Sequence, residues 1–359
     1  MMHIVADAHI PFVEDIFSAL GNVVLIAGHE IDRESVKTAD VLIVRSITPI
    51  NEELLGDSSV KFVGSATAGL DHVDQLFLQE KGIHFASAPG ANADSVVEYV
   101  FAALAELSIR FRTHFVDKTI GIVGCGNVGH RLADTCRSLG MRVIENDPPR
   151  GEREKGFVDL NTLLRQSDIV SVHTPLASEG PYATRGLIGE AQLALMKEDS
   201  WLIQSSRGGV CDETAMIDAR EGNRIGALVL DVWEGEPKVN GLHIDKTDIA
   251  TGHIAGYSID AKKKGVEMVL DGARQAFGLP MIQHQDPAGL PSRRHVSPGS
   301  ELLEALRHLY DIREDDHRFR KVMNAADIEK GFHAYRATYP MRRSFDFNWA
   351  YLSNPNERS

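Results

Sequence analysis

The chain has 359 residues, which at about 150 residues per domain suggests two or three domains. Hydrophobic residues make up 43% and charged residues 25%, so the composition is globular and excludes a disordered or fibrous chain. The formal net charge of −13 argues against general binding of nucleic acids or anionic membranes, but it leaves room for a local basic pocket that holds a small anion.

No targeting signal is evident. Residues 1–7 lack the basic and apolar regions of a signal peptide, and no run of about 18 apolar residues occurs. Cys125, Cys136 and Cys211 form no CxxC pair, which supports neither a disulfide framework nor a cysteine zinc site. We therefore expect a soluble, cytoplasmic protein that binds no metal.

The first hundred residues alternate between short apolar runs and amphipathic segments such as 13–20 and 51–55. The runs are rich in β-branched residues and do not strictly alternate, as expected for strands that are covered on both faces. They comprise residues 3–6, 23–26, 41–44 and 62–64. This pattern predicts a doubly wound parallel sheet.

A long helix is predicted from about Asp94 to Phe111, with apolar residues on one face and Asn92 or Asp94 as its cap. A second alternating series follows it, with helices that include 129–139 and 159–164. Its expected strands are 119–123, 142–146, 169–173, 201–204, 227–230 and 249–251. Six strands after one long helix predict a Rossmann-type α/β sheet that binds a dinucleotide.

The pattern changes after residue 280. Four prolines, Pro280, Pro287, Pro291 and Pro298, interrupt the chain, and a new helix is predicted to begin at 297–307. We expect a linker at 281–298 and a small C-terminal domain at 299–359.

A glycine loop occupies the turn after the strand at 119–123. Gly124, Gly126 and Gly129 match the G-x-G-x-x-G pattern, between a predicted strand and a predicted helix as the motif requires. The loop and the helix N-terminus can receive a pyrophosphate. Asp147 ends the next strand and suits the ribose hydroxyls, which favours NAD over NADP, although Arg150 lies close by. The alternative is a purely structural turn.

Three polar residues follow late strands, where open α/β sheets build their sites: Arg207, Glu236 and His253. A guanidinium can grip a carboxylate, an imidazole can accept a hydroxyl proton, and a carboxylate can orient the imidazole. Each residue alone has an ordinary structural explanation, in a loop, an acidic turn or a packed histidine. Together they suit the oxidation of a 2-hydroxy acid.

Four separated motifs occur in one order: 124–129, 205–209, 230–237 and 251–256. With them the sequence resembles the D-isomer-specific 2-hydroxyacid dehydrogenases. The segments 44–48, 62–69, 146–150 and 253–258 resemble in particular a branch of that family that acts on a phosphorylated substrate. The resemblance implies that Arg207, Glu236 and His253 are catalytic. It implies that Asp147, Thr174, Asp231, Gly256 and the backbone at Asn127 and Val128 bind NAD. Cys125 departs from the commoner small apolar residue.

The same resemblance implies three domains. Residues 1–93 with 258–280 would form a flavodoxin-like substrate or lid domain, 94–257 the NAD-binding domain, and 299–359 an α+β domain that forms a homodimer. A cleft between the first two would close on NAD and substrate. Ser46, Thr67 and Tyr257 would bind the substrate. Arg45, Arg342 and Arg343 are candidates for its phosphate, and the role of 346–359 stays open.

Two alternatives remain open on this evidence. One is another family member, such as a 3-phosphoglycerate dehydrogenase, although no regulatory small-molecule domain pattern follows the linker. The other is a non-catalytic protein that senses NAD on the same scaffold. A metal-dependent hydrolase is disfavoured because the histidines show no ligand spacing.

Overall fold

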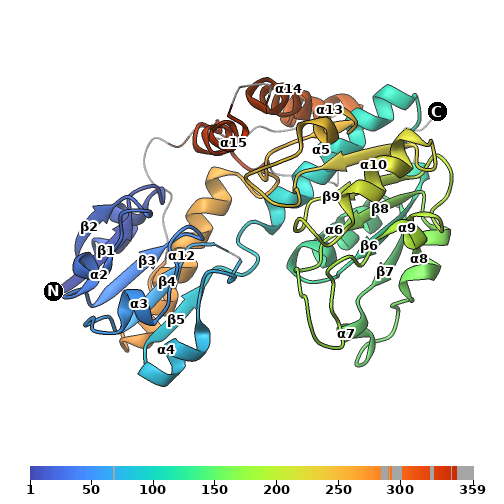
Figure 1. The fold of residues 1–359 in the computed structure, drawn as a ribbon. Helices are drawn as coiled ribbons and strands as arrows, with labels where there is room; N and C mark the ends of the chain where they lie inside the picture. Colours follow the sequence, from blue (N-terminus) through green and yellow to red (C-terminus); the bar gives the residue numbers. More distant parts are fainter. Residues whose placement is uncertain are drawn as a thin grey trace. The chain divides into compact units, whose positions relative to one another are not determined.

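The computed structural model of the chain describes residues 1–67, 69–283, 290, 292, 301–323, 327–340 and 342–345. They form two compact units, each with its own parallel sheet (Figure 1). Unit 1 comprises the described residues of Met1–Ala93, Tyr257–Ser292 and Arg342–Ser344. Unit 2 comprises those of Asp94–Gly256, Arg293–Met341 and Phe345–Ser359.

Unit 1 contains a five-stranded sheet in which all neighbouring strands are parallel. Its strands are β1 (Met2–Asp7), β2 (Gly21–Ile26), β3 (Val41–Val44), β4 (Phe62–Ser65) and β5 (His84–Ser87). Their order, β2-β1-β3-β4-β5, is that of flavodoxin-like folds, as expected. The sequence did not predict β5, because this edge strand has only one large apolar residue, Phe85.

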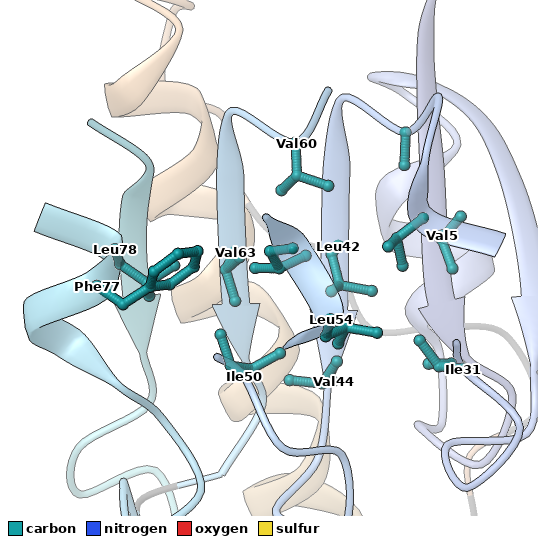
Figure 2. Packing of buried hydrophobic residues seen from close by; sticks show 13 residues of the cluster. Val5, Ile31, Leu42, Val44, Ile50, Leu54, Val60, Val63, Phe77 and Leu78 are labelled. Carbon is teal, nitrogen blue, oxygen red and sulfur yellow. The ribbon is translucent and has the colours of Figure 1, made fainter. Parts of the chain in front are cut away.

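Helices cover both faces of this sheet, which explains the apolar runs of its strands. They are α1 (Val13–Phe17), α2 (Arg33–Val36), α3 (Glu52–Leu55), α4 (Gln75–Lys81) and α12 (Ile259–Ala276). Figure 2 shows Val5, Leu42 and Val63 packed with residues of α3 and α4 on one face. On the other face Ile4 and Ile43 pack with α1 and α12. Thus a segment more than 160 residues away from β4 completes the core of unit 1.

Unit 2 contains a six-stranded parallel sheet in the order β11-β10-β9-β8-β6-β7. The strands are β6 (Thr119–Val123), β7 (Arg142–Asn146), β8 (Ile169–Val172), β9 (Trp201–Gln204), β10 (Ala227–Leu230) and β11 (Ile249–Ala250). The strand order changes direction between β6 and β8, and ligands of open α/β sheets bind beyond the strand ends at such a point.

The helices of unit 2 include the predicted long helix, α5 (Ala93–Phe111), and the helix after the glycine loop, α6 (Asn127–Ser138). The others before the C-terminal segment are α7 (Pro148–Gly151), α8 (Leu160–Gln166), α9 (Glu190–Leu193), α10 (Glu213–Glu221) and α11 (Gly241–Asp245), with a 3₁₀ turn at Phe115–Asp117. Within the described part of the chain, none of the helices has the length and apolar character needed to cross a lipid bilayer.

The described residues of the C-terminal segment form three helices: α13 (Leu302–Leu309), α14 (Ile312–Met323) and α15 (Ile328–Ala337). We expected an α+β domain here, but residues 301–323, 327–340 and 342–345 contain no strand. Most of the predicted linker at 281–298 and all of 346–359 lie outside the described residues. Phe319 of α14 stacks on Trp233 at 5.9 Å, so these helices pack onto the loops of unit 2.

Candidate active site

The carboxyl ends of all six strands of unit 2 lie along one edge of its sheet, because neighbouring strands are parallel. Each residue that the sequence patterns singled out in this unit follows one of these ends. Gly124 follows β6, Asp147 follows β7, Thr174 follows β8, Arg207 follows β9, Asp231 and Glu236 follow β10, and His253 and Gly256 follow β11. The sheet therefore gathers them at one edge.

The three glycines of the loop after β6 are needed for different physical reasons. Gly124 has φ 86°, and a Cβ there would lie 2.9 Å from the His173 carbonyl. A Cβ on Gly129 would lie 2.0 Å from the Gly124 carbonyl oxygen. These two are required by the fold, whereas a Cβ on Gly126 would meet nothing within 4 Å. The space beside Gly126 is open, which fits the close approach of a ligand phosphate.

The start of α6 offers donors to that space. The N–H groups of Asn127 and Val128 find no acceptor in the described part of the chain, as expected in the first turn of a helix. An anion is stabilised there by these donors and by the helix dipole.

Asp147 joins the glycine loop to α7. One of its carboxylate oxygens accepts a hydrogen bond from the Cys125 N–H at 2.8 Å, and the other from the Arg150 N–H at 3.1 Å. Arg150 donates to the Cys125 carbonyl at 2.6 Å and pairs with Glu154 at 2.5 Å. Since the Arg150 charge is compensated inside the chain, it is a poor receptor for a 2′-phosphate. The carboxylate fits the unphosphorylated ribose of NAD.

Two buried hydroxyls near this loop lack a hydrogen-bond partner: Thr174 Oγ1 and Ser205 Oγ. They follow β8 and β9, and the Thr174 methyl group would lie 2.8 Å from a Cβ on Gly124. Unsatisfied buried polar atoms are rare in folded proteins, and a bound ligand is a common explanation. Thr174 was predicted to bind NAD. Ser205 begins the motif at 205–209, but only Arg207 of that motif was predicted to have a role.

His253 and Glu236 form the closest pair of the site. His253 Nδ1 lies 2.7 Å from Glu236 Oε2, and Glu236 Oε1 accepts the N–H of Trp233 at 2.8 Å. Because the carboxylate only accepts, this pairing assigns the proton to Nδ1 and leaves Nε2 as the nitrogen for a substrate proton. The predicted pairing of these two residues is therefore present in the geometry.

The backbone at His253 is strained, with φ 58°, an unusual value for a non-glycine residue. The carbonyl of Asp231 holds it by accepting the His253 N–H at 2.6 Å. The carboxylate of Asp231 accepts from Ile254, Ala255 and the Thr251 hydroxyl within 2.7–2.9 Å. Burial raises the pKa of Asp231, against the effect of His253 and these hydrogen bonds. Asp231 thus anchors the histidine loop, and its contact with NAD stays a prediction.

Arg207 lies on a neighbouring loop. Its guanidinium donates to the Ser206 carbonyl at 2.8 Å, and no carboxylate among the described residues pairs with it. A Cβ on the next residue, Gly208, would lie 2.0 Å from the Trp233 carbonyl oxygen, so the Arg207 loop packs directly against the Glu236 loop. The site thus combines an uncompensated cation with a paired imidazole.

Unit 1 holds the residues predicted to bind the substrate. Arg45 follows β3, and its Nε donates to the fully buried Asp7 at 2.6 Å. Thr67 follows β4, with Oγ1 2.9 Å from Ser65 Oγ, and Ser46 is exposed. Sequence reasoning missed Asp7, although a carboxylate that ends a buried strand is a signal for a buried cation partner.

The other predicted residues of unit 1 are engaged within the chain. Arg343 forms an ion pair with Asp260 of α12 at 2.9 Å and is nearly buried. Arg342 donates to the carbonyl of Tyr257 at 3.1 Å. The segment 342–344 is thereby tied to the start of α12, which makes Arg343 less suited than Arg45 to bind a substrate phosphate.

Comparisons with known proteins agree with this geometry. Residues 106–255 match the model of the "D-isomer specific 2-hydroxyacid dehydrogenase, NAD binding domain", and residues 289–350 match a domain of unknown function, DUF3410. The chain is 42% identical to the erythronate-4-phosphate dehydrogenase of Chromohalobacter salexigens, over 96% of this chain and 92% of the relative. It is also 42% identical to that of Proteus mirabilis, over 100% and 97%.

Solved structures support the fold. The D-lactate dehydrogenase of Aquifex aeolicus, complexed with NAD and lactic acid, superposes with a TM-score of 0.62. It is 24% identical, and the match covers 77% of this chain and 96% of that one. This similarity confirms the Rossmann-type α/β architecture that the strand pattern predicts.

Proposed function

We propose an activity for this chain from the premise that it belongs to the erythronate-4-phosphate dehydrogenases, within the D-isomer-specific 2-hydroxyacid dehydrogenase family. As a member of this family it is an NAD-dependent oxidoreductase that acts on a small hydroxy acid. The reaction is the oxidation of 4-phospho-D-erythronate to (R)-3-hydroxy-2-oxo-4-phosphooxybutanoate, a step in pyridoxal 5′-phosphate synthesis. The His253–Glu236 pair, at the sheet edge that carries the glycine loop, is the observation that supports it most.

His253, Glu236 and Arg207 of unit 2 each have a separate role in the reaction. His253 Nε2 accepts the proton of the C2 hydroxyl, and Glu236 stabilises the imidazolium that forms. Arg207 holds the substrate carboxylate through its guanidinium. NAD, when bound, supplies the acceptor for the hydride that leaves C2.

The cofactor residues are those of the loop and of the neighbouring strand ends. The N–H groups of Asn127 and Val128 bind the pyrophosphate, and Asp147 binds the ribose hydroxyls. Thr174, Asp231 and Gly256 bind the nicotinamide half. The partnerless hydroxyl of Thr174 supports this assignment, because a ligand would satisfy it.

Arg45 binds the substrate phosphate. Its Nε is held by buried Asp7, and its two Nη groups have no other partner in the described part of the chain, so a fixed cation is available to an anion. Ser46, Thr67 and Tyr257 complete the substrate contacts. Arg342 and Arg343 remain weaker candidates, since each already binds a group of unit 1.

The assembly is a homodimer that forms through the C-terminal segment, to be checked by analytical ultracentrifugation of the whole chain and of a variant truncated before residue 299. The reaction takes place in the cytoplasm. In support, all three cysteines are buried and free, as in proteins of reducing compartments.

The deciding experiment measures NADH formation from 4-phospho-D-erythronate, with 3-phosphoglycerate in parallel and a carbonyl trap that removes the product. A kcat/KM at least tenfold higher for the erythronate phosphate supports the proposal. Preference for phosphoglycerate assigns the alternative substrate with the same mechanism. Tight NAD binding without turnover of either compound favours the sensor alternative.

A further inference from the structure

The strand that leads to His253 is held by few backbone hydrogen bonds. This strand is β11, an edge strand of only two residues, Ile249 and Ala250. An edge strand has unpaired backbone groups on one side, and so short a strand forms few ladder hydrogen bonds. Asp231 holds the strained backbone of His253 and the residues after it, but its carboxylate does not bind β11, so another element has to hold this strand in place.

Helix α14 supplies a clamp for this edge. Asp316 Oδ1 accepts the Ala250 N–H at 2.7 Å, and the same carboxylate pairs with Arg320 at 2.9 Å. Arg320 in turn donates to the carbonyls of Ile244 and Thr247 at 2.6 and 2.7 Å. One ion pair on α14 thus fixes both β11 and the turn that leads into it.

The same helix also places an aromatic ring between the two catalytic loops. Phe319 is fully buried and stacks on Trp233 at 5.9 Å with an interplanar angle of 29°. Two of its ring atoms would lie 2.7 and 2.9 Å from a Cβ on Gly252, the residue before His253. Trp233 is the residue whose N–H holds Glu236. Phe319 therefore lies against the support of both members of the pair.

Trp233 also links the loop of Glu236 to the loop of His253 directly, because its indole N–H donates to the Thr251 carbonyl at 2.8 Å. The two loops are thereby tied together on the side that faces Phe319. Loss of the ring would leave a cavity that the loops can relax into, and we expect this relaxation to change the distance between His253 and Glu236.

We infer that Asp316 and Phe319 are positioning residues, which hold the His253–Glu236 pair in its working geometry from the C-terminal helices. This inference rests on the proposed function only in those tests that measure turnover of 4-phospho-D-erythronate. It assigns to the region that matches a domain of unknown function a role within the active site of its own chain.

The first test compares Phe319→Leu with Phe332→Leu. Phe332 is also buried and packs edge-on against Phe319 at 6.0 Å, but the three atoms nearest to a Cβ on Gly252 belong to Phe319 and Tyr335. Phe319→Leu should lower kcat by about 10- to 100-fold, because small misplacements of reacting groups are costly. KM for the substrate and Kd for NAD should change less than threefold. Phe332→Leu should keep kcat within about threefold of the unaltered protein.

The deuterium isotope effect separates positioning from loss of folded protein. With substrate deuterated at C2, Phe319→Leu should show a larger isotope effect on kcat, since a slower chemical step becomes rate-limiting. A smaller fraction of folded enzyme would lower kcat with the isotope effect unchanged. Equal kcat losses and unchanged isotope effects in both variants would overturn the inference.

Asp316 provides a graded second test. Asp316→Ala removes the acceptor for the Ala250 N–H and should reduce kcat about tenfold. Asp316→Asn keeps an acceptor oxygen for the Ala250 N–H but loses the ion pair with Arg320, so it should restore part of that loss. Equal activity of the two variants would contradict the clamp.

A spectroscopic measurement keeps the inference testable even if 4-phospho-D-erythronate is not the substrate. The Nδ1 proton of His253 in its hydrogen bond to Glu236 should give a downfield ¹H resonance, assigned by its absence in His253→Asn. Phe319→Leu should weaken or shift this resonance, and Phe332→Leu should retain it. Failure of turnover with a normal resonance pattern would reject the proposed function alone, whereas an unchanged resonance in Phe319→Leu would reject the positioning role.

Discussion

One strand in each of the two sheets leads into a buried aspartate: β1 ends with Asp7, and Asp231 follows β10. The pKa values of these two carboxyls are shifted in opposite directions. Burial raises the pKa of Asp7 in unit 1, but hydrogen bonds from Arg45 and His9 and the charge of Arg45 outweigh it, so its pKa is lowered. Burial raises the pKa of Asp231 in unit 2, and there the compensating effects of His253, Thr251 and two amides are too small, so its pKa is raised.

The difference shows what each carboxylate holds. Asp7 binds a guanidinium directly, and a full opposite charge at 2.6 Å compensates for the loss of water. Asp231 binds backbone N–H groups and a hydroxyl, which compensate less. Unit 1 thus uses its strand-end carboxylate to fix the guanidinium of Arg45, and unit 2 uses its own to hold the loop that carries His253.

The substitution with the largest expected effect is His253→Asn in unit 2, which tests whether this unit supplies the proton acceptor. We expect kcat to fall by about two to four orders of magnitude, because a positioned acid–base group contributes that much. The Kd of NAD should stay unchanged, since the glycine loop lies after other strands. Steady-state kinetics and fluorescence titration with NADH check both. A nearly normal kcat would remove the proton-transfer role from unit 2.

Arg45→Ala tests the role of unit 1. A charge-assisted hydrogen bond to phosphate contributes about 1.5–3 kcal/mol, so KM for the phosphorylated substrate should rise about 10- to 100-fold. Arg45→Lys, which keeps the charge without the planar fork, should lose less. An unchanged KM in Arg45→Ala would mean that the cation of unit 1 does not meet the substrate.

Gly126→Ala tests whether Gly126, unlike Gly124 and Gly129, is needed to bind NAD and not to form the fold. A Cβ at Gly126 enters open space, so the free energy of unfolding should change by no more than about 0.5 kcal/mol. The Kd of NAD should rise about tenfold, because the new methyl group obstructs the pyrophosphate. Gly241→Ala, which also meets nothing within 4 Å, is the matched control and should leave both quantities unchanged. A normal Kd in Gly126→Ala would contradict the cofactor assignment of this loop.

The smallest expected effect is the pH dependence of stability. The lowered pKa of Asp7 means that its ionised form stabilises the fold, so the stability advantage of the unaltered protein over Asp7→Asn should grow as pH rises through about 4. The raised pKa of Asp231 has the opposite sign, so the advantage over Asp231→Asn should shrink as pH rises above that value. Urea unfolding of the unaltered protein and both variants between about pH 3 and 7 measures both effects, and pH dependences of the same sign would contradict the contrast between Asp7 and Asp231.

Most strands and the longer helices could be predicted from local patterns, and so could the position of the candidate site residues at one edge of the sheet of unit 2. The strand at 41–44 is a continuous apolar run because both faces of its sheet are covered, and the glycine loop has a spacing that its turn requires. Arg207 and His253 could be recognised because residues after parallel strands share one edge. Strand β5 was not predicted because its four residues carry no periodic apolar signal, and Ser205 was assigned no role although it begins the motif at 205–209.

Tertiary structure alone decided which of these residues work together. The 2.6 Å pair of Arg45 and Asp7 joins positions 38 residues apart, and Asp316 reaches Ala250 across 66 residues. An amphipathic pattern reports which face of a helix is buried but not what it is buried against, because the partner is chosen by packing of the whole chain. The sequence by itself determined most strands of both sheets, the glycine loop and the chemical types at the candidate site. Packing of the whole chain decided that α14 lies against β11 and the loop of His253.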